Sequence, residues 1–228
     1  MLTSDPKVLG LAILLGVAPS LVWLWFWLKQ EEKNPEPKGL ITIVFIMGMI
    51  SVIFVLPIQK FIQAHVSSYE WQIGLWASSE EIIKYLAVMA ILYKSDHAEE
   101  AIDWPIYLMT AALGFAALEN ILFIIKPLSL GETTVGLMTG QLRFLGSTLL
   151  HVVASGALGA ALGIAHHMKG WKKNWHFLVG LTFAIALHSV FNFFIMKNGG
   201  SDFLKVFAFL WVAAVVVMLL FEKVRRMN

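Results

Sequence analysis

Seven long apolar stretches constrain the fold of this 228-residue chain more than any other feature of its sequence. Hydrophobic residues make up 58% of the chain and charged residues only 14%, whereas soluble domains are about one quarter charged. About 20 apolar residues span the hydrocarbon core of a bilayer, and a helix satisfies its own backbone polar groups there. We therefore predict an all-α, polytopic membrane bundle of about seven transmembrane helices. The stretches cover residues 9–28, 40–58, 71–93, 104–125, 142–165, 177–196 and 203–221.

The connections between these stretches are too short to hold a soluble domain, so we predict one integral membrane domain over residues 1–228. The lipid bilayer is then a partner of the whole chain. We find no basic nucleic-acid-binding pattern and therefore expect no nucleic acid partner. The chain has no cysteine, which excludes disulfides, thiol catalysis and thiolate metal ligands.

The basic residues favour one orientation in the membrane. Of the 17 Lys and Arg residues, ten fall on one set of connections, six on the opposite set, and Lys84 lies within a span. Cytoplasmic loops carry the excess of Lys and Arg in most membrane proteins. We therefore predict an outer N-terminus and a cytoplasmic C-terminus.

Six polar side chains interrupt four of the apolar stretches at positions where a bilayer should exclude them. A side chain that is costly to keep in lipid is usually kept for chemistry or transport. Measured from the predicted span ends, all six lie about 8 to 14 Å below the same membrane face. We therefore expect them to meet in one polar pocket near the outer leaflet. They are Glu80, Glu81, Glu119, His151, His188 and Asn192.

These residue types together are suited to the activation of water. Two histidines and a carboxylate form an open zinc-binding set, and a further glutamate could then deprotonate the bound water. Without a metal, the same groups could supply a glutamate base, an imidazole acid and a carboxamide donor to an oxyanion. The residue types are compatible with both schemes.

Four segments with these residues resemble the motifs of the PrsW intramembrane proteases, distant relatives of the CAAX prenyl-processing and bacteriocin-processing membrane proteases. They are EEIIK at 80–84, FAALEN at 115–120, the segment 143–151, and HSVFN at 188–192. The resemblance covers the motif-bearing core, residues 71–196. It implies an integral-membrane endopeptidase of the bacterial cell membrane, usually described as a metalloprotease. It also implies a membrane-anchored protein substrate, such as an anti-sigma factor cut on its extracytoplasmic side.

On physical grounds we assign a role to each of the six residues. Glu80 is the expected base that activates water, and Glu81 holds it in orientation or accepts its proton. Asn192 is the expected donor to the tetrahedral oxyanion. The expected ligands of a metal ion, with zinc as the favoured cofactor, are Glu119, His151 and His188. Lys84 and Arg143 are expected to be counter-charges, with Lys84 opposite Glu80 at the i,i+4 spacing.

Three other functions fit the same residues. A proton- or cation-coupled transporter could relay ions through these acids and histidines, but we find no internal repeat of the kind that builds many transporters. A prenyl-protein or peptide-export protease would be expected to carry histidine in place of Glu119. A non-enzymatic scaffold would need none of the six.

A ridge of small residues in the stretch 142–165 supports close helix packing. Ser155, Gly159 and Gly163 lie at intervals of four, flanked by Gly156 and Ala160. Such ridges let the backbones of neighbouring helices approach closely. Short glutamate and histidine side chains need this closeness in order to meet.

Overall fold

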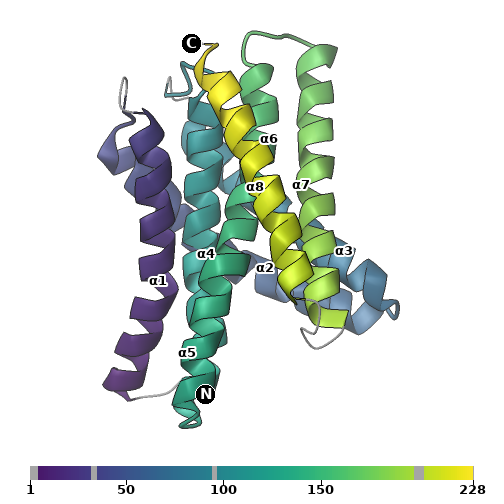
Figure 1. Ribbon diagram of the computed structural model, residues 1–228. Helices are drawn as coiled ribbons and strands as arrows, with labels where there is room; N and C mark the ends of the chain where they lie inside the picture. Colours follow the sequence, from purple (N-terminus) through teal and green to yellow (C-terminus); the bar gives the residue numbers. More distant parts are fainter. Residues whose placement is uncertain (1–4, 32–34, 94–96, 198–202, 228) are drawn as a thin grey trace.

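The computed structural model describes residues 5–31, 35–93, 97–197 and 203–227, and these residues form a bundle of long helices (Figure 1). The predicted all-α membrane fold is confirmed. Its elements are α1 (Pro6–Leu28), a short 3-10 helix (Lys29–Glu31), α2 (Lys38–His65), α3 (Tyr69–Leu92), α4 (Asp103–Ser129), α5 (Thr133–Leu142), a π-helical turn (Arg143–Ser147), α6 (Thr148–Ile164), α7 (Trp171–Lys197) and α8 (Phe203–Arg225).

Among the described residues, six helical segments are long and apolar enough to cross a membrane: α1, α2, α4, the continuous rod Thr133–Ile164, α7 and α8. The α3 helix has 24 residues, which corresponds to about 36 Å, but its charged residues make it less hydrophobic. Figure 1 shows that α1 begins at the lower end of the bundle and α8 ends at the upper end, as an odd number of crossings requires. Which end faces the outside stays a prediction from the basic residues.

The fifth predicted span begins earlier than we expected. We placed it at residues 142–165, whereas helical structure starts at Thr133 and continues through a π-helical turn into α6. The polar residues between Thr133 and Gln141 lower the local hydropathy, so a prediction based on hydropathy does not detect the start of this helix. Arg143 therefore lies inside a helical rod of 32 residues, at the π-helical turn, a feature that often occurs at functional sites.

The centre of the bundle is formed by α4 and α6. All side chains from Asp103 to Ala117 in α4 and from Thr148 to Ala160 in α6 are buried. The other long helices surround this pair and expose many large apolar side chains, as expected of surfaces that face lipid. A site built on α4 and α6 is therefore kept away from the hydrocarbon.

Close contact between α4 and α6 depends on the predicted ridge of small residues. A Cβ atom added to Gly159 would overlap the backbone of Pro105 in α4, and one added to Gly156 would overlap the side chain of Met109. Gly163 faces the backbone carbonyl of Ala101. The absence of side chains at these positions thus sets the spacing of the two central helices.

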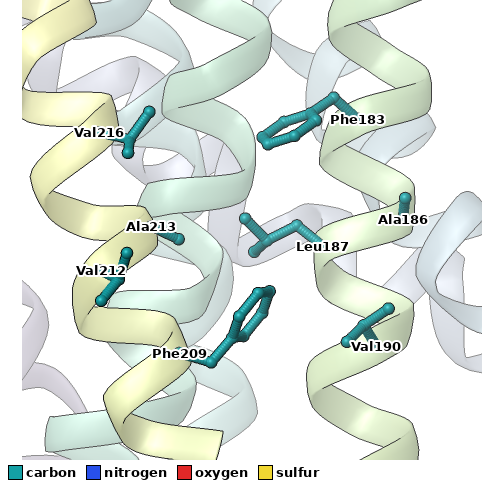
Figure 2. Close-up of a pocket in the computed structure, with 8 residues that line it drawn as sticks. All are labelled: Phe183, Ala186, Leu187, Val190, Phe209, Val212, Ala213 and Val216. Carbon is teal, nitrogen blue, oxygen red and sulfur yellow. The ribbon is translucent and has the colours of Figure 1, made fainter.

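A hollow of about 340 Å³ separates the middle parts of α7 and α8, and Figure 2 shows apolar side chains from both helices pointing into it. Leu187 of α7 and Phe209 of α8 are among the residues that line it. Since successive helical residues are about 100° apart, the neighbouring His188 lies on another side of α7. The hollow is therefore separate from the polar residues of α7.

A polar cluster that contains none of the six predicted site residues lies where α4 begins. The Tyr107 hydroxyl contacts the carboxyl group of Glu36 and lies 3.0 Å from the backbone carbonyl of His97. Burial, together with the nearby charges of Asp103 and Glu100, raises the pKa of Glu36 from 4.5 to about 7, against the lowering effect of the Tyr107 hydrogen bond. One hydroxyl hydrogen cannot serve both acceptors, so a protonated Glu36 that donates to Tyr107 fits this arrangement.

Replacement of Gly159 by alanine should destabilise the protein by about 1–3 kcal/mol, since the added methyl group meets backbone that cannot move aside. The matched control is Gly74→Ala in α3, where an added Cβ atom has no neighbour within 4 Å. That control should be neutral or stabilising by up to about 1 kcal/mol. The measurement is the free energy of unfolding in detergent. Equal effects of the two variants would contradict the close α4–α6 contact.

The pKa of Glu36 predicts a pH dependence of stability. Because the folded protein binds this proton more tightly than the unfolded chain, stability should fall as pH rises from 4.5 to about 7 and level off above that range. Glu36→Gln should remove this contribution, and the exposed Glu132→Gln should leave it in place. The unfolding midpoint, measured from about pH 4 to about pH 8, checks this. A Glu36→Gln profile parallel to that of the wild type would refute the raised pKa.

Candidate metal centre

Five of the six predicted polar residues meet in one cluster among α3, α4, α6 and α7. Hydrogen bonds or ion pairs connect the two α3 glutamates with His151 of α6 and His188 of α7, and Glu119 of α4 with His151. Both histidines and both α3 glutamates are buried, while 20% of the Glu119 side chain is exposed. The expected convergence of residues from four separate spans is confirmed.

Glu81 has partners at both carboxylate oxygens. Lys84 Nζ lies 2.5 Å and His188 Nδ1 2.8 Å from Oε1, and the Ser155 hydroxyl donates to Oε2 at 2.9 Å. Lys84 therefore forms its ion pair at the i,i+3 spacing with Glu81, which corrects our prediction of a partnership with Glu80. With all these contacts, Glu81 holds the His188 ring in place.

Glu119 belongs to a network that starts at the π-helical turn. The Arg143 guanidinium forms an ion pair with the Glu119 carboxylate and also donates to Asn120 Oδ1 at 2.6 Å. Asn120 in turn donates to the Thr148 hydroxyl at 2.9 Å. On the other side, Glu119 Oε2 lies 3.0 Å from His151 Nε2. Glu119 therefore orients the His151 ring. We predicted that Arg143 is a counter-charge without naming its partner, and the structure pairs it with Glu119.

These contacts determine which nitrogen of each histidine carries hydrogen. An ionised carboxylate only accepts hydrogen bonds, so Nδ1 of His188 donates to Glu81 and Nε2 of His151 donates to Glu119. The opposite nitrogens, His188 Nε2 and His151 Nδ1, then keep their lone pairs in the neutral rings. A carboxylate behind each imidazole is the usual arrangement of metal-binding histidines.

The third glutamate faces both of these lone pairs. Glu80 Oε2 lies 3.6 Å from His188 Nε2 and 4.0 Å from His151 Nδ1. Oε2 is buried and has no hydrogen-bond partner among the described residues. The other oxygen of Glu80, Oε1, accepts a hydrogen bond from Gln59 at 2.8 Å. Buried polar atoms are rarely left without a partner. A cation between the three residues would satisfy Oε2.

The three residues can hold a metal ion. One ligand atom from each of Glu80, His151 and His188 lies within 4.8 Å of the other two. Two imidazole nitrogens and one carboxylate oxygen are a common set in metal sites that keep a position open for water. The residues present therefore fit the metal that the sequence led us to expect, although Glu80 occupies the position in this group that we had given to Glu119.

Among the residues that the structure describes, Asn192 is the predicted site residue that does not join the cluster through hydrogen bonds. It lies one turn beyond His188 in α7 and is partly buried. Within the described part of the chain its carboxamide makes no hydrogen bond to the glutamates or imidazoles. Its role as oxyanion donor stays a prediction.

Gln59 is the site residue that sequence analysis missed. It lies in α2 and fixes one oxygen of Glu80, while its own backbone carbonyl accepts a hydrogen bond from Trp76 Nε1 at 3.2 Å. We had ended the second span at residue 58, whereas α2 continues to His65. Gln59 follows an apolar run, so in the sequence it marked the boundary of a span. It reaches Glu80 because α2 continues past residue 58.

The comparison with known families agrees with this geometry. The sequence profile described as "PrsW family intramembrane metalloprotease" matches residues 36–221. The chain is 31% identical to the protease PrsW of Oceanobacillus iheyensis, over 87% of this chain and 90% of that protein. It is 27% identical to the protease PrsW of Geobacillus kaustophilus, over 87% of each chain.

A third relative, the protease PrsW of Bacillus subtilis, is 26% identical over 86% of this chain and 88% of its own length. No solved structure matches the chain. The matched region includes all the helices that build the glutamate–histidine cluster and every candidate membrane span except α1, with the match ending inside α8. The chain is a multi-pass membrane protein and belongs to the PrsW family of intramembrane metalloproteases.

Proposed function

We propose that Glu80, His151 and His188 hold a zinc ion with which this protease hydrolyses a peptide bond of a membrane-anchored protein. The observation that supports this proposal is the approach of the unpartnered Glu80 Oε2 to the ring nitrogen of each imidazole that carries no hydrogen, His188 Nε2 and His151 Nδ1. Zinc prefers such nitrogen and oxygen ligands, and when bound it acidifies water and polarises a carbonyl group.

The three glutamates have different partners and, in this proposal, different roles. Glu81 and Glu119 each use an oxygen to orient one imidazole, and each has a cation beside it, Lys84 and Arg143 respectively. Among the described residues, Glu80 has no lysine or arginine at hydrogen-bond distance. It is therefore the carboxylate that completes the metal group and that takes the proton of the attacking water, which keeps the role of base that we predicted for it.

The substrate must bring a peptide bond to a site buried between helices. Water attacks an extended peptide more readily than one whose carbonyl is engaged in a helix, so the substrate segment has to unwind at the scissile bond. Asn192, partly exposed one turn from His188, is our proposed donor to the oxyanion that forms there. An anti-sigma factor with a single membrane anchor is the kind of substrate that we propose, cut toward the outer membrane face.

Glu80→Gln should abolish cleavage of a membrane-anchored substrate, with a loss of about 10² to 10⁴-fold or more, because the amide neither accepts the proton nor binds zinc well. The measurement is the rate of cleavage by the purified protein, together with its zinc content. The exposed Glu70→Gln in the first turn of α3 is the matched control and should retain both. Cleavage at the wild-type rate by Glu80→Gln would sink the proposal and would favour a transporter or a scaffold.

Gln59→Leu should lower kcat/KM about tenfold to a hundredfold, because one hydrogen bond to a charged group is worth about 1.5–3 kcal/mol. Without this donor the Glu80 carboxylate can rotate away from the two imidazoles. Gln63→Leu, one turn further along α2 and exposed, should leave kcat/KM within about twofold. Similar losses in both variants would show that Gln59 acts only through the stability of α2.

A further inference from the structure

The ammonium group of Lys84 lies inside the cluster that we propose to bind metal. Its side chain is 0% exposed. Nζ lies 2.5 Å from Glu81 Oε1, 3.2 Å from His151 Nδ1 and 5.1 Å from the centre of the Phe115 ring. A carboxylate, an imidazole nitrogen and an aromatic face thus surround the three hydrogens of the ammonium group.

The contact with His151 uses an atom that the metal ion would also need. A neutral imidazole has one lone pair, and because Nε2–H donates to Glu119, that lone pair is on Nδ1. Nδ1 is also the nitrogen that faces Glu80 Oε2. It can accept a hydrogen bond from Lys84 or bind a metal ion, but it cannot do both at once.

We propose that Lys84 competes with the metal ion for Nδ1 of His151 and thereby weakens metal binding by this protease. The inference rests on the proposed metal role of Glu80, His151 and His188. When Nδ1 binds the ion, the ammonium group keeps its ion pair with Glu81, so metal binding breaks one of its contacts and leaves the other intact.

The charges of the cluster support the same conclusion. Three glutamates face two cations, Lys84 and Arg143, so the cluster has one net negative charge when the imidazoles are neutral. A divalent ion changes this to one net positive charge. With a neutral residue at position 84 the occupied cluster would have no net charge, and the repulsion between the ammonium group and the ion would be gone.

A lysine with only a structural role predicts the opposite effect. Loss of a buried ion-pair partner leaves the other charge uncompensated and disturbs the fold. Glu81 would then lose its position and would orient His188 less well, which weakens metal binding. The direction of the change in metal affinity therefore separates the two roles.

The test measures zinc affinity of the full-length purified protein in detergent, by competition with a chromophoric chelator. Lys84→Met should bind zinc at least about tenfold more tightly than the wild type. Lys60→Met, an exposed lysine of α2, is the matched control and should leave the affinity unchanged. The absorption spectrum of the Co²⁺ form should still report nitrogen and oxygen ligands in Lys84→Met, since all three proposed ligands remain.

If Lys84→Met does not fold, a second pair of variants tests whether Lys84 competes with the metal ion. Glu81→Gln keeps an acceptor for His188 and removes the charge that pairs with Lys84, so the ammonium group can be removed without leaving a buried carboxylate. The double variant Glu81→Gln/Lys84→Met should bind zinc more tightly than Glu81→Gln alone. Equal or weaker binding by the folded variants, with zinc bound by the wild type, would overturn the competition and leave the proposed function standing. A folded wild type without zinc affinity would overturn both.

Discussion

Three carboxylates lie inside this membrane bundle, those of Glu80 and Glu81 buried and that of Glu119 20% exposed, and the need to pair them constrains how the helices pack. An unpaired ionised group is costly in a low-dielectric interior, so each carboxylate must find cations or hydrogen-bond donors. Lys84 and Ser155 meet Glu81, and Arg143 meets Glu119. Lys84 shares α3 with Glu81, but Ser155 and Arg143 come from other parts of the chain than the glutamates they meet, and these contacts require the helices to pack in one arrangement.

The packing of α4 against α6 makes this arrangement possible. Glycines without side chains let the two central backbones approach closely at Gly159 and Pro105. The π-helical turn between α5 and α6 directs Arg143 to Glu119 while His151 follows two turns later in the chain. Small residues and one irregular turn thus bring short side chains together that regular, widely spaced helices would keep apart.

The two polar clusters of the protein handle buried acids in different ways. In the glutamate–histidine cluster, cations compensate two carboxylates, and the third faces imidazole lone pairs that suit a metal ion. At the start of α4, Glu36 lies near other acids, and its pKa rises to about 7, so that a proton serves as the compensation.

The sequence was enough to predict the membrane class, the approximate spans, the family and the polar residues of the site, because apolar runs and motif residues can be read locally along the chain. It did not determine the partners of those residues. Lys84 pairs with Glu81 instead of Glu80, Gln59 joins the site from α2, and Glu80 lies with the two imidazoles in the group that could hold a metal ion, where we expected Glu119. Only the tertiary structure decided these contacts, since a shift of one residue rotates a helical side chain by about 100°. The rotation of each helix, and with it the atom that faces the site, depends on packing against the other helices.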